Sequence, residues 1–196
     1  LNMNKRGYLL ELLRSGKSVF TFRELMLLWH DSTEQAVLSR VHYYTQKGQL
    51  FQIRKGIYSK EKNYNIFEAA AKIYKPSYIS FETILAAEGI IFQEYSTLFL
   101  ASYQTKEIEC DGIRIYFRKL KDSILYNDKG LQYNNDVMTA TKERAMLDMI
   151  YINKDYHFDN TTSLDFNILF ELSDVYENKR LEAEVKKLYK IQKKEL

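Results

Sequence analysis

The N-terminal part of the chain combines apolar positions of helical period with short signals for caps and turns. Apolar side chains one helical turn apart predict a first helix over residues 5–14, which Gly16 ends. An apolar pair at residues 19–20 has the character of a short strand. Thr21 stands three residues before Glu24, the spacing of a capping box, and therefore predicts the start of a second helix.

A third helix and a hairpin follow. Ser32 is the expected cap of this helix, and Gly48 supplies the left-handed residue that ends it. Two strands, at residues 50–54 and 57–59, flank a tight turn. The order helix, short strand, helix, helix and hairpin predicts a winged helix-turn-helix domain over residues 1–62.

The third helix has two different faces when its side chains are placed at about 100° per residue. Val37, Val41 and Tyr44 fall together and are expected to pack inward. The opposite face carries small, amide and hydroxyl side chains, and we expect no acid on it because Glu34 falls towards the inner side. Such a face can approach base edges in a major groove, while a basic hairpin turn can touch phosphates. The candidate DNA-binding residues are Thr33, Gln35, Ala36, Ser39, Arg40, Tyr43 and Lys47 on the helix and Arg54 and Lys55 at the turn.

From residue 63 to residue 196 the pattern is that of a second, α+β domain. A helix over residues 66–74 ends before Pro76, and Ser80 is the expected cap of a helix that stops at Gly89. Three segments of alternating character predict a small antiparallel meander, with Asp111 and Gly112 as a hairpin turn. These segments span residues 96–103, 106–110 and 112–120. Further helices are predicted at residues 142–152, 166–176 and 179–194.

Charge is divided unevenly along the chain, although the net charge is only +3. Residues 1–62 hold eleven basic and five acidic side chains, whereas residues 63–178 hold eleven basic and eighteen acidic ones. The last eighteen residues again carry an excess, with seven basic and three acidic side chains. A basic N-terminal segment followed by an acidic one indicates that the N-terminal segment binds a polyanion such as nucleic acid. The basic last helix either extends that contact or is an ordinary solvated helix.

Composition narrows the classes of protein further. The single cysteine, Cys110, cannot form an internal disulfide, and no apolar run approaches the roughly 20 residues that cross a bilayer. We therefore expect a soluble cytoplasmic protein with no membrane partner. The glycines are isolated, so no glycine-rich loop is available to hold a nucleotide phosphate.

Few residues point to catalysis. The three histidines and Cys110 are scattered without the spacing of a metal motif. Glu107, Glu109 and Asp111 alternate on one strand, where carboxylates could hold Mg²⁺ as in a nuclease or nucleotidyltransferase. The other reading is a charged edge strand that guards against sheet-to-sheet pairing. Our leading prediction is a protein that is not an enzyme and has no cofactor, and the Mg²⁺-dependent enzyme is the alternative.

Three segments together resemble the bacterial AbiEi antitoxins, predicted transcriptional regulators of type IV toxin–antitoxin pairs in defence against viruses. The first, residues 47–58, reads KGQLFQIRKGIY and is similar to the basic wing of that family. The second, residues 76–85, reads PSYISFETIL and looks like the start of its second domain. The third, residues 141–148, reads TKERAMLD and resembles a helix opening late in that domain. The resemblance covers most of residues 5–152.

The resemblance implies an antitoxin that represses its own operon by binding inverted repeats in double-stranded DNA through the winged domain. It also implies a second domain that counters a nucleotidyltransferase toxin, without a stable complex between the two proteins being required. No catalytic residue is carried over to this chain. A winged domain used only for binding another protein is a further alternative to DNA binding.

Overall fold

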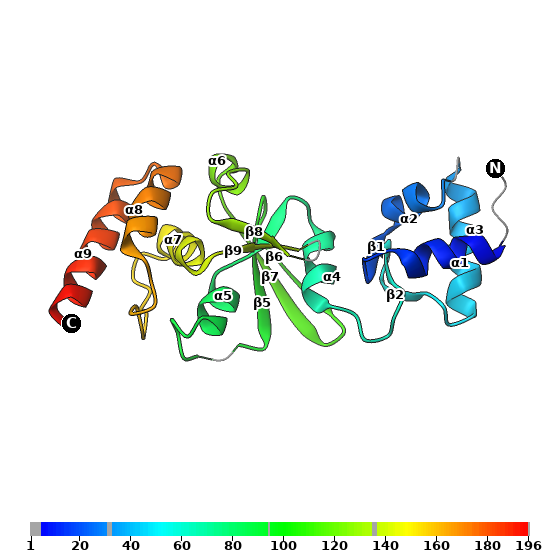
Figure 1. Ribbon diagram of the computed structural model, residues 1–196, viewed down its shortest axis with the longest axis horizontal. Helices are drawn as coiled ribbons and strands as arrows, with labels where there is room; N and C mark the ends of the chain where they lie inside the picture. The colour runs from blue at the N-terminus through cyan, green and yellow to red at the C-terminus, as the bar shows by residue number, and fades with distance from the viewer. Residues whose placement is uncertain (1–4, 31–32, 94, 135–136, 196) are drawn as a thin grey trace. The chain divides into compact units, whose positions relative to one another are not determined.

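The computed structural model describes residues 5–30, 33–93, 95–134 and 137–195. It divides into two compact units, residues 1–73 and 74–196 (Figure 1). The sequence pattern changes after Lys62, but the helix that follows packs on the first unit and extends it to Ile73. A cis peptide bond joins Lys75 and Pro76 just beyond this helix.

The first unit combines helices with a three-stranded antiparallel sheet in the order β1-β3-β2. Its elements follow one another as the sequence predicts, with a further helix at the end. They are α1 (Lys5–Arg14), β1 (Val19–Thr21), α2 (Phe22–Leu28), α3 (Glu34–Gln46), β2 (Phe51–Arg54), β3 (Ile57–Ser59) and α4 (Ile66–Ile73).

Local caps explain where the helices of this unit begin and end. The Thr21 hydroxyl accepts from the Glu24 N–H at 3.1 Å, and the Glu24 carboxylate accepts from the Thr21 N–H at 2.8 Å, which confirms the predicted capping box. Helix α3 begins after Thr33, whose hydroxyl accepts a hydrogen bond from the Ala36 N–H at 3.3 Å. Ser32, the expected cap, lies outside the described residues. Gly48 ends the helix in the left-handed region, as predicted.

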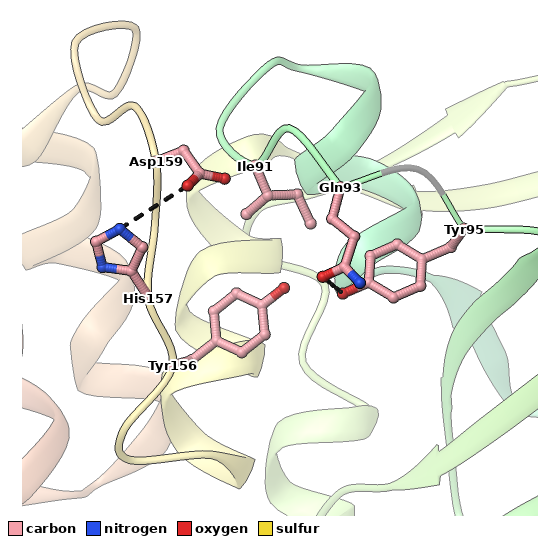
Figure 2. Close-up of a pocket in the computed structure, with 6 residues that line it drawn as sticks. All are labelled: Ile91, Gln93, Tyr95, Tyr156, His157 and Asp159. Atoms are coloured by element: carbon pink, nitrogen blue, oxygen red, sulfur yellow. Dashed lines mark hydrogen bonds and ion pairs between the residues drawn. The ribbon is translucent and has the colours of Figure 1, made fainter.

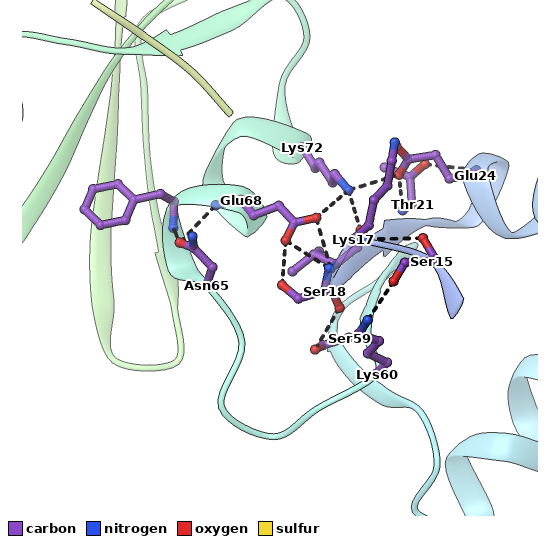
Figure 3. Close-up of polar contacts among 12 residues, drawn as sticks. Ser15, Lys17, Ser18, Thr21, Glu24, Ser59, Lys60, Asn65, Glu68 and Lys72 are labelled. Carbon is purple, nitrogen blue, oxygen red and sulfur yellow. Dashed lines mark hydrogen bonds and ion pairs between the residues drawn. The ribbon is translucent and has the colours of Figure 1, made fainter. Parts of the chain in front are cut away.

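Buried charges fasten α4 to strand β1 (Figure 3). The Glu68 carboxylate accepts hydrogen bonds from Ser18 N–H at 3.2 Å, Ser18 Oγ at 2.5 Å and Val19 N–H at 3.1 Å. Lys72 lies 2.9 Å from Glu68 Oε1 and 3.6 Å from Glu24 Oε2, and it donates to the Val19 carbonyl. Because both buried charges have partners, this arrangement avoids the cost of isolated ions and holds α4 in place. We call Glu68, Lys72 and their partners Ser18 and Val19 the α4 clamp.

The second unit is a six-stranded mixed sheet with helices (Figure 1). Helices α5 and α7 pack together beside the sheet, and α8 and α9 pack on α7. The strands lie in the order β6-β7-β5-β4-β9-β8 and are β4 (Ser77–Ile79), β5 (Thr97–Ser102), β6 (Lys106–Cys110), β7 (Ile113–Lys119), β8 (Leu131–Asn134) and β9 (Val137–Ala140). The helices are α5 (Glu82–Ala87), α6 (Asp122–Leu125), α7 (Lys142–Ile152), α8 (Phe166–Ser173), the 3-10 turn η1 (Asp174–Tyr176) and α9 (Lys179–Glu195).

The predicted antiparallel meander is wrong in its pairing, although its three strands exist. Strand β7 forms the predicted hairpin with β6, through a turn in which Asp111 and Gly112 both have positive φ. It then pairs parallel with β5, so it lies between the other two strands. Residues 99–102 of β5 are all buried, which suits a central strand, whereas β6 exposes Lys106, Glu107 and Glu109 and suits an edge.

A buried polar network lies at the centre of the second unit. Asp148 accepts hydrogen bonds from the hydroxyls of Tyr176 at 2.6 Å, Ser80 at 2.7 Å and Tyr78 at 2.9 Å. Arg144 donates to Asp148 at 3.4 Å and to two backbone carbonyls at 2.7 Å. Both charged side chains are fully buried, although their i, i+4 spacing is also that of an exposed pair on a helix surface. Ser80, the expected cap of α5, donates into this network instead of capping the helix, so that prediction is wrong.

The α4 clamp predicts a large loss of stability in Glu68→Gln. Removing this charge leaves Lys72 buried without its nearest carboxylate and weakens the bonds to β1, so we expect a loss of about 3–5 kcal/mol in the free energy of unfolding. Urea unfolding followed by tryptophan fluorescence measures this loss. Trp29 is the single tryptophan of the chain and is buried in the first unit, so its fluorescence reports on this unit. Glu61→Gln, at an exposed position, is the control. Equal stability of the two variants would disprove the structural role of the clamp.

Glu24 predicts a pH dependence of the first unit. Burial raises its pKa, but the Thr21 N–H bond, Lys72 and Lys17 outweigh that effect and hold the pKa below its ordinary value of 4.5. A lowered pKa contributes stability above about pH 4.5, and this contribution is lost as the pH falls through the folded-state pKa. The stability difference between wild type and Glu24→Gln should therefore narrow from pH 6 to pH 3, as measured by Trp29 fluorescence in urea. A difference that stays constant over this range contradicts the assignment.

Candidate nucleic-acid interface

An apolar core fixes the rotation of α3 about its own axis. Val37, Val41 and Tyr44 are buried, as predicted, and pack in one cluster with Leu25 and Trp29. The Trp29 indole N–H donates to a backbone carbonyl of α1 at 3.1 Å, which satisfies its one polar atom in the core. Because three inward side chains are held in this cluster, the residues on the other side of α3 face outward.

The outward face of α3 differs in part from the predicted one. The exposed side of α3 includes Leu38 and His42, which the prediction left out. Ala36 and Arg40, which the prediction placed on this side, are half-buried at its border. Glu34, expected on the inner side, is exposed in the first turn, so the claim of an acid-free surface is wrong at this end of the helix. Apart from Glu34, the exposed residues of α3 and its two caps carry no acid; they are Thr33, Gln35, Leu38, Ser39, His42, Tyr43, Gln46 and Lys47.

Arg40 lies at the junction of α3 with the other two helices. Its guanidinium carbon is 3.5 Å from the centre of the Tyr8 ring and 5.5 Å from that of the Trp29 ring. The side chain is half-buried. A guanidinium stacked on two rings contributes to packing within the unit as well as charge, so Arg40 connects α3 to α1 and α2.

The hairpin turn between β2 and β3 presents a second basic feature. Arg54 pairs with Ile57, leaving a two-residue turn of Lys55 and Gly56, and Gly56 adopts φ +81°. This backbone conformation favours glycine. Lys55 is exposed, whereas Arg54 is half-buried. Within the described residues, Nη1 of Arg54 is buried and has no hydrogen-bond partner.

This combination of helix, cap and basic hairpin lies within a segment that is similar to a known family. Residues 8–59 match the family of the transcriptional regulator AbiEi antitoxin. The matched segment runs from α1 to the end of β3 and confirms the resemblance in the first unit of the chain. The two other segments that resemble AbiEi antitoxins, residues 76–85 and 141–148, lie outside it. A comparison with curated proteins found no match.

The carboxylates considered for an enzyme do not form a metal site in the described part of the chain. There, no three side chains of His, Cys, Asp or Glu are grouped so that they could hold a metal ion. Glu107 and Glu109 lie exposed on the edge strand β6, and Glu109 faces Arg114 on β7. This placement favours the interpretation of β6 as a charged, protected edge of the six-stranded sheet.

A small cavity of about 240 Å³ lies between the loops that follow α5 and α7 (Figure 2). Burial, and then a hydrogen bond with Tyr95, raises the pKa of Tyr156 above its ordinary value. His157 is 87% exposed and lies 3.8 Å from Asp159. The described lining offers hydrogen bonds but no serine, cysteine or lysine nucleophile; it consists of Ile91, Gln93, Tyr95, Tyr156, His157 and Asp159.

Within the described residues, no helix is both long and apolar enough to span a bilayer.

The stacking of Arg40 predicts that it matters for folding, unlike its neighbours on the exposed side of α3. Arg40→Ala removes the guanidinium from Tyr8 and Trp29, and we expect the first unit to lose about 1–2 kcal/mol of stability. Gln35→Ala, at an exposed position, should change stability by less than about 0.5 kcal/mol. Urea titrations followed by Trp29 fluorescence compare the two variants. If both are equally stable, the stacking contributes nothing measurable.

Proposed function

We propose that the first unit is a winged helix-turn-helix that binds operator DNA, and that the chain is a transcriptional autorepressor and antitoxin. The strongest support is that three observations coincide. The exposed surface of α3 carries amide, hydroxyl and lysine side chains, the same unit has a basic hairpin turn, and both lie inside the segment that matches AbiEi regulators. Side chains of this kind can pair with base edges in a major groove. The function on this proposal is recognition rather than catalysis, in the cytoplasm.

The candidate residues fall into different roles on this proposal. Gln35 and Ser39, exposed near the start of α3, are placed to read base edges, with Tyr43 beside them. Lys47 and Lys55 are exposed cations suited to phosphates, and the half-buried guanidinium of Arg54 can donate to a phosphate oxygen through its accessible N–H groups.

Three further candidate residues have local structural roles, so we assign them a supporting role in DNA binding. Thr33 caps α3 by accepting from the Ala36 N–H, and a hydroxyl in this role can also donate at the helix N-terminus. The small side chain of Ala36 allows close approach to DNA. Arg40 positions α3 through its stacking on Tyr8, so its effect on DNA binding would be indirect.

The second unit would carry the antitoxin role. Its partner on this proposal is a nucleotidyltransferase toxin encoded beside it, and the two proteins need not form a stable complex. The operator would contain inverted repeats, as the resemblance to AbiEi antitoxins implies. Two copies of a recognition helix can then bind two half-sites related by symmetry.

Variants of α3 and of the turn should weaken DNA binding in different ways. We expect Gln35→Ala to weaken binding to DNA from upstream of the protein's own gene by about 1–3 kcal/mol and to leave binding to a scrambled duplex unchanged. Lys55→Gln should weaken both duplexes alike and reduce the slope of log affinity against log salt by about 0.9. Fluorescence anisotropy across a salt series measures both effects.

Matched controls are available in the second unit. Gln132→Ala and Lys106→Gln change the same residue types at exposed positions outside the first unit, and should bind as wild type does. Absence of salt-dependent binding to either duplex would refute the DNA-binding proposal. A stable complex with another protein in its place would support the alternative of a protein-binding winged module.

A further inference from the structure

Helix α9 exposes an almost entirely basic surface. Every exposed residue in its described part is Lys or Arg except Ala183 and Ile191, and its acids Glu182 and Glu184 are half-buried. The exposed basic residues are Lys179, Arg180, Lys186, Lys187, Lys190 and Lys193. We call this surface the α9 lysine face.

The opposite side of α9 is anchored in the second unit. Leu181 and Val185 are buried in its core. Tyr189 packs against Phe166 and Phe170, with ring centres 5.2 and 5.6 Å apart. The apolar side of the helix is therefore already occupied. An amphipathic helix that enters a membrane surface needs that side free, so its use as a membrane anchor is disfavoured.

Some cations of α9 have structural partners and others do not. Arg180 donates to the backbone carbonyls of Ile150 and Tyr151 at the end of α7, and Lys187 pairs with Glu184 at 3.1 Å. In the described part of the chain, no carboxylate lies within 4.0 Å of the ammonium groups of Lys179, Lys186 and Lys190. These three cations are therefore placed to meet an external anion.

The geometry of the face fits a phosphate backbone. Lys179, Lys186, Lys190 and Lys193 fall on one side of the helix at about 100° per residue and span about 21 Å along it. Each strand of duplex DNA carries one phosphate per 3.4 Å of the duplex axis, so a face of this length can meet several phosphates. Single-stranded nucleic acids are typically held by aromatic side chains that stack on bases. The exposed positions of the described α9 include no aromatic residue, which favours a duplex.

The negative charge of the residues before α9 limits where on the second unit duplex DNA can bind. Residues 63–178 carry seven more acidic than basic side chains, so the segment before α9 repels a polyanion. Because the α9 lysine face belongs to a single helix, contact with a polyanion is restricted to that helix. Based on these observations, we propose that the α9 lysine face binds the phosphate backbone of duplex DNA, adding sequence-independent contacts to those of the first unit. This inference rests on the proposed DNA-binding function.

The salt dependence of binding by the full chain tests the inference. The variant Lys179→Gln/Lys186→Gln/Lys190→Gln should reduce the slope of log affinity against log salt by about 2–3, because each lost phosphate contact contributes about 0.9. The probe is a labelled 30-base-pair duplex of random sequence, read by fluorescence anisotropy. The triple lysine-to-arginine variant at the same positions keeps the charge and should keep the slope.

A second triple variant controls for net charge alone. Lys106→Gln/Lys121→Gln/Lys154→Gln removes three exposed lysines elsewhere in the second unit and should change the slope by less than half as much. Equal slopes for the two glutamine triples overturn the inference. It is also overturned if the α9 triple loses binding to phosphatidylserine vesicles but none to the duplex.

The first-unit variants separate the inference from the function on which it rests. If Lys47→Gln/Lys55→Gln binds as wild type does while the α9 triple loses slope, the winged-unit proposal fails and the α9 inference stands. If the first-unit variant loses slope and the α9 triple does not, the α9 inference alone fails. Wild type that binds no duplex at low salt overturns both.

Discussion

The packing of α3 on Trp29 is the constraint on which the candidate interface depends. Val37, Val41 and Tyr44 can be buried together only in one rotation of the helix, and the tryptophan occupies the space between them and α1. That rotation decides which polar residues face outward and brings Arg40 over the Tyr8 ring. The proposed recognition surface is thus a consequence of core packing, because the residues of α3 that take no part in burial are the ones left available for a ligand.

Local signals were sufficient for most of the first unit. The Thr21–Glu24 box, Gly48 and the turn at Gly56 act within a few residues, so their effect on the backbone can be read without knowing the fold. The place of Arg40 could not be read in this way, because its partners come from two other helices. A signal was present: Arg40 lies three residues after the inward Val37 and four before the inward Tyr44, which places it at the border of the buried stripe.

The second unit was harder because its sheet joins segments that are distant in sequence. Alternation located β5, β6 and β7, but the parallel pairing of β5 with β7 depends on which strand can tolerate burial on both faces. Strands β8 and β9 were missed. Their short segments give little periodicity, and β9 is held in the sheet by pairing with β4, far earlier in the chain.

Arg144 and Asp148 also show why polar residues mislead sequence reasoning. Their i, i+4 spacing fits an exposed ion pair, yet both are buried, with partners supplied by Tyr78, Ser80 and Tyr176. Two of these partners belong to the segment at residues 76–85, and the ion pair to the segment at residues 141–148. The two segments that resemble AbiEi antitoxins outside the matched region therefore meet in one buried network. Because these residues are buried and hold the fold of the unit together, the proposed antitoxin role would fall to other, exposed residues of the second unit.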